Sequence, residues 1–180
     1  SQQDGSLIWS HDFDDIPALY SDYVPTAWLD DQGTPETDDD QDRVYVTLNA
    51  DEFNHPDKRG VHAIQNGEKL WHLAINNDFN TAGALNADGS KLHLVSRSDP
   101  FSPSVLYAVN TETGTMDWEY SLQEQTFTTS TPAIGTHGDI YVVTYQVPVD
   151  YQVGQSLPGK VQSIGSDGQL NWSFDLTSTS

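Results

Sequence analysis

The densest group of residues that could do chemistry is an acidic stretch, DDQGTPETDDDQD, at positions 30–42. Seven of its thirteen residues are acidic, and carboxylates packed so closely repel one another unless water or a cation lies between them. Because Ca²⁺ takes about six to eight oxygen ligands, the stretch is a candidate calcium site. Its ligands would be Asp30, Asp31, Asp38, Asp39, Asp40 and Asp42. The spacing is not that of an EF-hand loop, and a solvated acidic loop is the alternative.

Residues that could act in catalysis are few. Of the six histidines, His11 and His93 fall in predicted strands, and the others lie in or near turns, at positions 55, 62, 72 and 137. His62 and His72 could meet across adjacent strands, but a chance placement of the two is the favoured interpretation. The sequence has no cysteine and no HExxH, GxSxG, phosphate-loop or haem-attachment motif. These residues leave an enzymatic role open but favour a protein without one.

Charge narrows the range of partners. The chain holds 7 basic and 27 acidic residues, a formal net charge of −20, and such a field repels nucleic acid and anionic lipid. A chain of this charge favours cations and basic proteins as partners, and it is also typical of a protein in a saline environment. No apolar run approaches the roughly 18 residues of a membrane span, and we see no signal peptide. We expect a mature or excised piece of a secreted, periplasmic or cell-surface protein.

The elements that would position these residues are marked by a recurring glycine and tryptophan. A Gly-x-x-x-Trp pattern occurs four times, as GSLIW (5–9), GEKLW (67–71), GTMDW (114–118) and GQLNW (168–172). After each glycine, apolar and polar residues largely alternate, as in Leu170, Trp172, Phe174 and Leu176. A period of two with one apolar face is typical of a half-buried strand, and the glycine favours a tight turn before it.

Three further strand sets recur between the tryptophans. The first is TAWL (26–29), GALN (83–86) and PAIG (132–135); the second is RVYV (43–46), KLHL (91–94) and DIYV (139–142); the third is VHAI (61–64), LYAV (106–109) and VQSI (161–164). Units of four short strands at this period are typical of β-propeller blades. The sequence therefore predicts an all-β, partial propeller over residues 1–180. It would have an outer strand at 5–13 and four-stranded antiparallel blades at 26–75, 80–122 and 127–176.

The middle unit carries a resemblance to a known family. Its segment LYAVNTETGTMDWEY (106–120) is similar to the repeat of quinoprotein-like β-propellers, the pyrroloquinoline-quinone type. Such repeats occur in quinone dehydrogenases and in non-enzymatic scaffolds such as the outer-membrane assembly lipoproteins, so the resemblance specifies fold better than activity. It implies that the tryptophans pack between neighbouring blades. The dehydrogenases bind their cofactor inside a complete propeller, whereas this chain has too few blades and no cysteine.

Long loops would gather on one face of the blades. The segments 14–26, 49–60, 96–104 and 145–159 are the most unequal parts of the repeats. They place aromatic residues and His55 beside carboxylates, a mixture that suits sugars, peptides or cationic partners. The candidate ligand-binding residues are Tyr20, Tyr23, Phe53, His55, Phe101, Tyr145 and Tyr151. The alternative is that these rings pack their own loops.

Together these patterns predict a non-enzymatic binding or scaffold module of a larger or oligomeric propeller. A fragment of a quinone- or Ca²⁺-dependent oxidoreductase is one alternative, and a polysaccharide-binding or polysaccharide-cleaving propeller is another. Three blades would leave apolar end faces around Trp9 and Trp172 exposed, and such patches bind partners. The expected partners are the remaining blades of a longer chain or other protein subunits, with carbohydrate or a basic protein as alternatives. Ca²⁺ is the one cofactor that the residues suggest.

Overall fold

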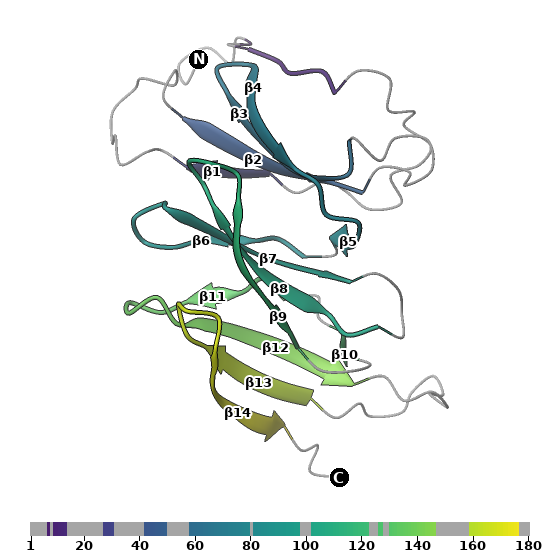
Figure 1. Ribbon diagram of the computed structural model, residues 1–180, viewed down its shortest axis with the longest axis vertical. Helices are drawn as coiled ribbons and strands as arrows, with labels where there is room; N and C mark the ends of the chain where they lie inside the picture. Colours follow the sequence, from purple (N-terminus) through teal and green to yellow (C-terminus); the bar gives the residue numbers. More distant parts are fainter. Residues whose placement is uncertain are drawn as a thin grey trace. The chain divides into compact units, whose positions relative to one another are not determined.

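The computed structural model describes residues 7, 9–13, 27–30, 42–49, 58–79, 81–97, 102–122, 126–127, 130–146 and 159–176. Within these ranges every regular element is a β-strand (Figure 1). The same ranges contain no helix long and apolar enough to cross a membrane. The chain forms two compact units, Ser1–Ile75 and Asn76–Ser180.

The first unit holds one antiparallel sheet of four strands, which we call blade 1. Its strands run in chain order: β1 (Ala27–Asp30), β2 (Arg43–Leu48), β3 (Gly60–Gln65) and β4 (Glu68–Leu73). The two-residue turn Asn66–Gly67 joins β3 to β4, and both of its residues have positive φ. This is the Asn-Gly turn that matches the twist of a hairpin.

The second unit holds two five-stranded sheets, blades 2 and 3. Blade 2 consists of β5 (Asp78–Phe79), β6 (Ala84–Leu85), β7 (Lys91–Arg97), β8 (Val105–Asn110) and β9 (Met116–Ser121). Blade 3 consists of β10 (Thr126–Phe127), β11 (Ala133–Ile134), β12 (Ile140–Gln146), β13 (Gly159–Ile164) and β14 (Leu170–Leu176). In each blade two short strands pair with the same long strand, so the innermost strand is in two pieces (Figure 1).

The predicted fold class is confirmed: the described residues form three antiparallel sheets, none closed into a barrel. Two details differ from the prediction. The pieces β5 and β10 were not expected, because a two-residue strand carries no alternation that a sequence could show. In the predicted outer strand 5–13, the described residues 7 and 9–13 belong to no strand. The blade limits and the single-propeller assignment stay predictions.

One row of side chains repeats across all three blades. The register pairs Tyr45 with Ala63 and Ala63 with Trp71, then His93 with Ala108 and Ala108 with Trp118, then Tyr141 with Ser163 and Ser163 with Trp172. Because the central residue is small, the two rings on either side meet over it, with centroids 5.8, 5.8 and 6.0 Å apart. We call the side of each sheet that bears this row its Trp face.

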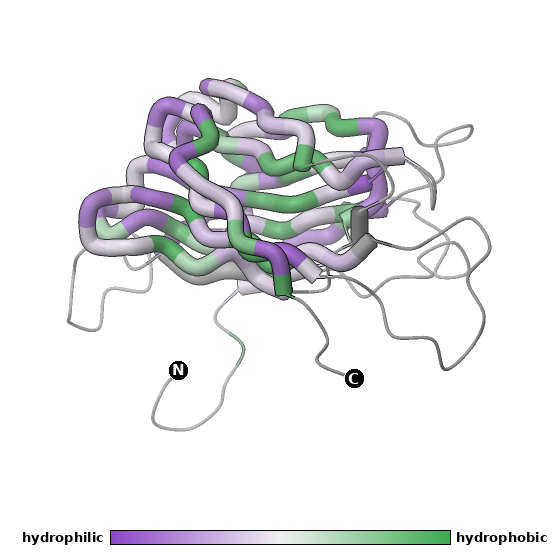
Figure 2. Tube along the Cα trace, turned by 90° about the horizontal axis from the view of Figure 1, so that it is seen from below, coloured by the Kyte–Doolittle hydropathy of each residue, from purple (hydrophilic) through white to green (hydrophobic). Residues whose placement is uncertain are grey.

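The apolar core of the second unit lies between blades 2 and 3. The Trp face of blade 2 contributes Val95, Leu106 and Leu122, and the opposite face of blade 3 contributes Ile140, Val142 and Ile164. Trp118 and Tyr120 pack against this cluster. Figure 2 shows apolar stretches along the strands and polar residues at the turns between them. Apolar contact between sheet faces therefore joins the two blades.

Candidate functional site

The Trp face of blade 3 is the largest group of exposed apolar side chains in the described residues. Its long strands bring together Tyr141, Val143 and Tyr145 from β12, Val161 from β13, and Trp172, Phe174 and Leu176 from β14. Four of the eight exposed large hydrophobic residues among the described residues belong to this face: Val143, Trp172, Phe174 and Leu176. In a chain of net charge −20, the strand residues of β12, β13 and β14 that form this face are uncharged, and Asp139 at its edge accepts a 3.0 Å hydrogen bond from Asn171. Exposed apolar patches of this kind mark interaction sites.

Blade 2 shows what covers such a face. Val95, Leu106 and Leu122 of blade 2 occupy the register positions of Val143, Val161 and Leu176 of blade 3. Leu122 is fully buried because blade 3 lies over it, whereas Leu176 is 40 % exposed and Phe174 is 62 % exposed. The two faces carry the same arrangement of side chains. Described residues cover the face of blade 2 but not the face of blade 3.

Trp118 shows how the seam between two blades is made. Its indole Nε1 donates a hydrogen bond of 3.0 Å to the carbonyl oxygen of Ser166, in the β13–β14 turn of blade 3. The ring lies against Gly168 of that turn so closely that a Cβ there would be 2.8 Å from Cδ2 of the indole. Trp9 lies next to Gly67 in a looser contact, since a Cβ at Gly67 would be 3.5 Å from the Trp9 Cβ and 3.9 Å from its ring atom Cε3. Trp172 is the matching residue of blade 3 and is 47 % exposed.

Of the predicted ligand-binding residues, the structure describes Tyr145 alone. It is half-buried on β12, lies opposite Gly159 in the ladder, and belongs to the Trp face of blade 3. Tyr20, Tyr23, Phe53, His55, Phe101 and Tyr151 lie outside the described residues. The grouping of these aromatic residues on one loop face therefore stays a prediction.

The predicted calcium ligands fall mostly outside the described residues as well. Asp30 ends β1, where its backbone pairs with Arg43, and Asp42 lies directly before β2. Asp31, Asp38, Asp39 and Asp40 are not described. No group of three or more His, Cys, Asp or Glu side chains in the described part of the chain could hold a metal ion. The calcium site stays a prediction.

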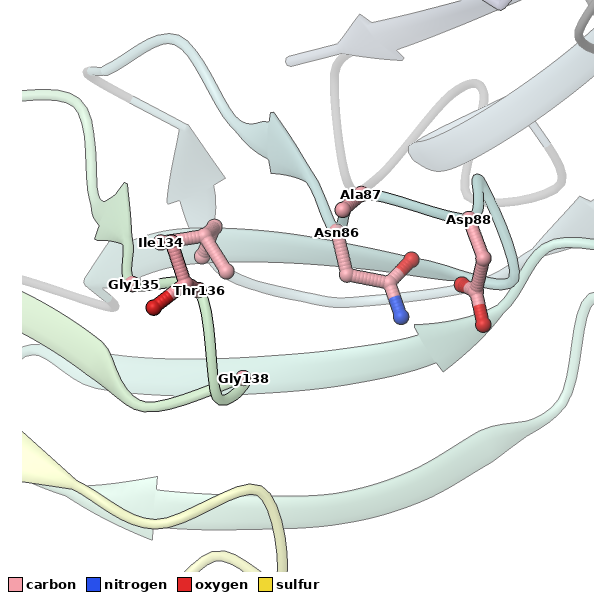
Figure 3. A pocket seen from close by; sticks show the side chains of 7 residues that line it. All are labelled: Asn86, Ala87, Asp88, Ile134, Gly135, Thr136 and Gly138. Carbon is pink, nitrogen blue, oxygen red and sulfur yellow. The ribbon is translucent and has the colours of Figure 1, made fainter.

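A small open pocket lies where two turns of blades 2 and 3 come together. It has a volume of about 200 Å³ and is lined by Asn86, Ala87, Asp88, Ile134, Gly135, Thr136 and Gly138 (Figure 3). Its polar side chains are engaged within their own turns: Asp88 accepts hydrogen bonds from the Ser90 backbone and hydroxyl, and Asn86 accepts one from Lys91. The Ser90 hydroxyl and backbone amide hold the pKa of the Asp88 carboxyl below its usual value. The pocket therefore offers a ligand few polar groups that are not already hydrogen-bonded within their own turns.

Two histidines that could meet across adjacent strands do so. His62 and His72 pair in the β3–β4 ladder, and their rings stack with centroids 4.3 Å apart. Burial is the largest cause that lowers the pKa of His62, to about 4. The same cause lowers the pKa of His93, on β7 of blade 2, to about 4. Both rings are almost fully buried, so at neutral pH they are uncharged parts of the interior.

Sequence reasoning found part of the exposed face and missed part of it. The alternation of Leu170, Trp172, Phe174 and Leu176 predicted it on β14, and the exposure of Trp172 is confirmed. The other predicted end face is the one around Trp9, and Trp9 itself is half-buried and lies against Gly67. Val143 was not identified because the run Tyr-Val-Val-Thr-Tyr on β12 does not show which valine points outward; the ladder with Val161 and Phe174 shows it.

Comparisons with known proteins place the chain in a family. The sequence profile of outer membrane protein assembly factor BamB matches residues 1–180. No curated protein sequence matches the chain. Two solved structures are similar to it: BamB from Moraxella catarrhalis (12% identity, TM-score 0.44, 82% of this chain covered) and a member of the DUF4221 family from Bacteroides vulgatus (10% identity, TM-score 0.49, 86% covered).

The chain spans about half the length of these two structures, 50% of the first and 52% of the second. Its three sheets, its repeated row of rings and the profile match over its whole length agree with the resemblance seen in residues 106–120. The chain therefore belongs to the family of outer membrane protein assembly factor BamB, a family of quinoprotein-like β-propellers.

Proposed function

We propose that this chain is a non-enzymatic binding or scaffold module of a larger or oligomeric propeller, located in the periplasm or outside the cell. The observation that carries the proposal is the exposed Trp face of blade 3, which repeats the design of a face that blade 2 buries. The name of the family, an assembly factor of the outer membrane, supports both the location and protein partners.

The partner that this face fits is another blade, supplied by the same parent chain or by another subunit. In the second unit, the Trp face of blade 2 receives Ile140, Val142 and Ile164 from blade 3, and Trp118 receives the Ser166 carbonyl. A sheet with the same two features would bury Phe174 and Leu176 and satisfy the indole of Trp172. Burying a large apolar side chain stabilises such a contact by roughly 1.5–3 kcal/mol.

The test extends the chain at its C-terminus with a second copy of residues 123–180. We expect the added blade to protect Trp172 from oxidation by N-bromosuccinimide several-fold, as read by mass spectrometry of its peptide. The matched control carries Val142→Asp in the added copy alone, which puts a charge into the new seam and should restore the reactivity of Trp172. An added blade that folds but leaves Trp172 as reactive as before would refute the proposal.

The oxidoreductase alternative has its own measurement. The chain is mixed with Ca²⁺ and pyrroloquinoline quinone, and the absorbance spectrum and dye-linked alcohol oxidation are followed. Under the proposal, neither a stoichiometric spectral change nor oxidation is expected. Observation of both would replace the scaffold role with an enzymatic one.

A further inference from the structure

Residues 9–13 lie against the β3–β4 hairpin through three contacts. Trp9 lies on Gly67, the His11 Nδ1 donates a 2.8 Å hydrogen bond to the Gly67 carbonyl oxygen, and the Phe13 ring meets the His62 ring edge-on with centroids 5.1 Å apart. The backbone of these residues belongs to no strand. Side-chain contacts, and no ladder of backbone hydrogen bonds, therefore hold the segment in place.

His62 lies at the base of this contact with one ring nitrogen unused. Its Nε2 is 2.7 Å from the carbonyl oxygen of Lys58. Because a carbonyl can only accept, Nε2 carries the hydrogen, and Nδ1 of the neutral ring is a bare acceptor. Nδ1 is buried and has no hydrogen-bond partner. A proton added to this ring would create a buried N–H with nothing to receive it.

We propose that His62 is an acid-sensitive latch: when its ring gains a proton, residues 9–13 leave the β3–β4 hairpin. Release lets water reach Nδ1 and uncovers the hairpin turn at Gly67. In the docked state Trp9 packs against this turn. Release therefore leaves the turn free to bind the tryptophan of a Gly-x-x-x-Trp strand from another polypeptide. The latch involves the first unit alone and does not depend on the face of blade 3.

The titratable groups among the described residues that act on His62 oppose its positive charge. β4 contributes His72, stacked on it, and Lys69; residues 9–13 contribute His11. Burial is the largest cause that lowers the pKa of His62, and these three neighbours lower it further, while the Lys58 carbonyl raises it. Among the described residues, none of the groups that act on it is a carboxylate. Once residues 9–13 have left, the ring is hydrated and its pKa returns toward 6.5.

The sign of the pH effect follows from these two values. The pKa of His62 is about 4 in the docked state, against an ordinary value of 6.5; because release hydrates the ring and raises its pKa toward that ordinary value, acid favours release. The ratio of released to docked segment should rise by up to tenfold for each pH unit between 6.5 and 4. Above pH 6.5 it should be constant.

The experiment uses the full chain with a spin label on one cysteine, which is unique because the sequence has none of its own. Ser10→Cys places the label on an exposed residue of the segment, and Thr136→Cys places it on an exposed residue of blade 3. Between pH 7.5 and 4.5 we expect the label at position 10 to become mobile while the label at position 136 stays unchanged. Simultaneous loosening at both positions, or none at position 10, would overturn the latch.

Two variants test the role of His62. His62→Gln keeps a donor for the Lys58 carbonyl but does not titrate, so the label at position 10 should stay immobile down to pH 4.5. His137→Gln, at an exposed position of blade 3, should respond as the unmodified chain does. Phe13→Ala leaves His62 in place and removes its cover, and it should mobilise the label already at pH 7.5. A full acid response in His62→Gln, or an immobile label in Phe13→Ala at both pH values, would contradict the proposal.

Discussion

At the residue scale, one position in each blade accepts either tyrosine or histidine, and the choice has a consequence in acid. Tyr45, His93 and Tyr141 hold the same place beside a small residue and a tryptophan. Tyr45 and His93 are almost fully buried. Histidine differs from tyrosine in that it titrates near neutral pH, so blade 2 carries a sensitivity to acid at a position where blades 1 and 3 do not.

Replacing His93 by the residue of its neighbours should remove that sensitivity. The pKa of His93 is about 4 in the folded chain, against an ordinary value of 6.5, chiefly because of burial. Between pH 6.5 and 4, the unfolded chain therefore binds a proton at His93 that the folded chain does not bind. The free energy of unfolding should fall by about 1.4 kcal/mol for each pH unit below 6.5 down to 4, and stay constant with respect to this group above 6.5.

We expect His93→Tyr to lose less stability than the unmodified chain between pH 7 and pH 5, as measured by urea unfolding at both values. His62 contributes a fall of its own in the same range, so the comparison concerns the difference between the two chains. The exposed variant His137→Gln serves as the control. An equal loss in His93→Tyr and in the unmodified chain would mean that His93 becomes protonated without cost.

At the element scale, the turn between the last two strands of a blade has two structural roles. In blade 3 it reverses the chain at Gly168, which has a φ of +81°, and it offers a flat surface to the indole of Trp118. A side chain at this position would meet both a strained backbone and an occupied space. Gly138, in the β11–β12 turn, has a φ of +84°, but a Cβ there would meet only the Ser166 side chain at 3.5 Å.

The two glycines therefore separate backbone strain from the blade contact. Gly138→Ala should cost about 1–2 kcal/mol, the usual penalty of a left-handed conformation. Gly168→Ala should cost more than this, because its Cβ would come within 3 Å of the Trp118 ring, and it should shift tryptophan emission to longer wavelength. The measurement is urea unfolding followed by fluorescence. If the two variants lose the same stability, the seam between blades 2 and 3 does not depend on this contact.

The elements that the sequence predicted well are those whose two sides differ. The four-residue runs RVYV and LYAV predicted β2 and β8. The alternation of apolar and polar residues predicted β9 and β14, since one face of each strand is apolar. The split inner strands and the half-buried state of Trp9 were not predicted, because both depend on neighbours far along the chain. The small residue in the third strand, Ala63, Ala108 or Ser163, was visible in the repeat, but its role beneath two rings appears only in the register.

At the scale of the whole molecule, an exposed apolar face should bring chains together. Phe174 and Trp172 are 62 % and 47 % exposed, and water around such side chains favours any arrangement that covers them. Repeat proteins of this kind bury each unit against its neighbours, and an uncovered terminal unit is a site of association. We therefore expect the isolated chain to associate with itself or with added partners in solution.

Light scattering at micromolar concentration should give a mass above the 19.9 kDa of one chain. Phe174→Lys puts a charge in the middle of the exposed face and should lower the mass toward that of a monomer. Ser173→Lys is its matched control, because residue 173 is the neighbouring exposed position on β14 and points to the other side of the sheet; it should leave the mass unchanged. A stable monomer of the unmodified chain would contradict the expectation, and would mean that blade 3 tolerates its Trp face in water.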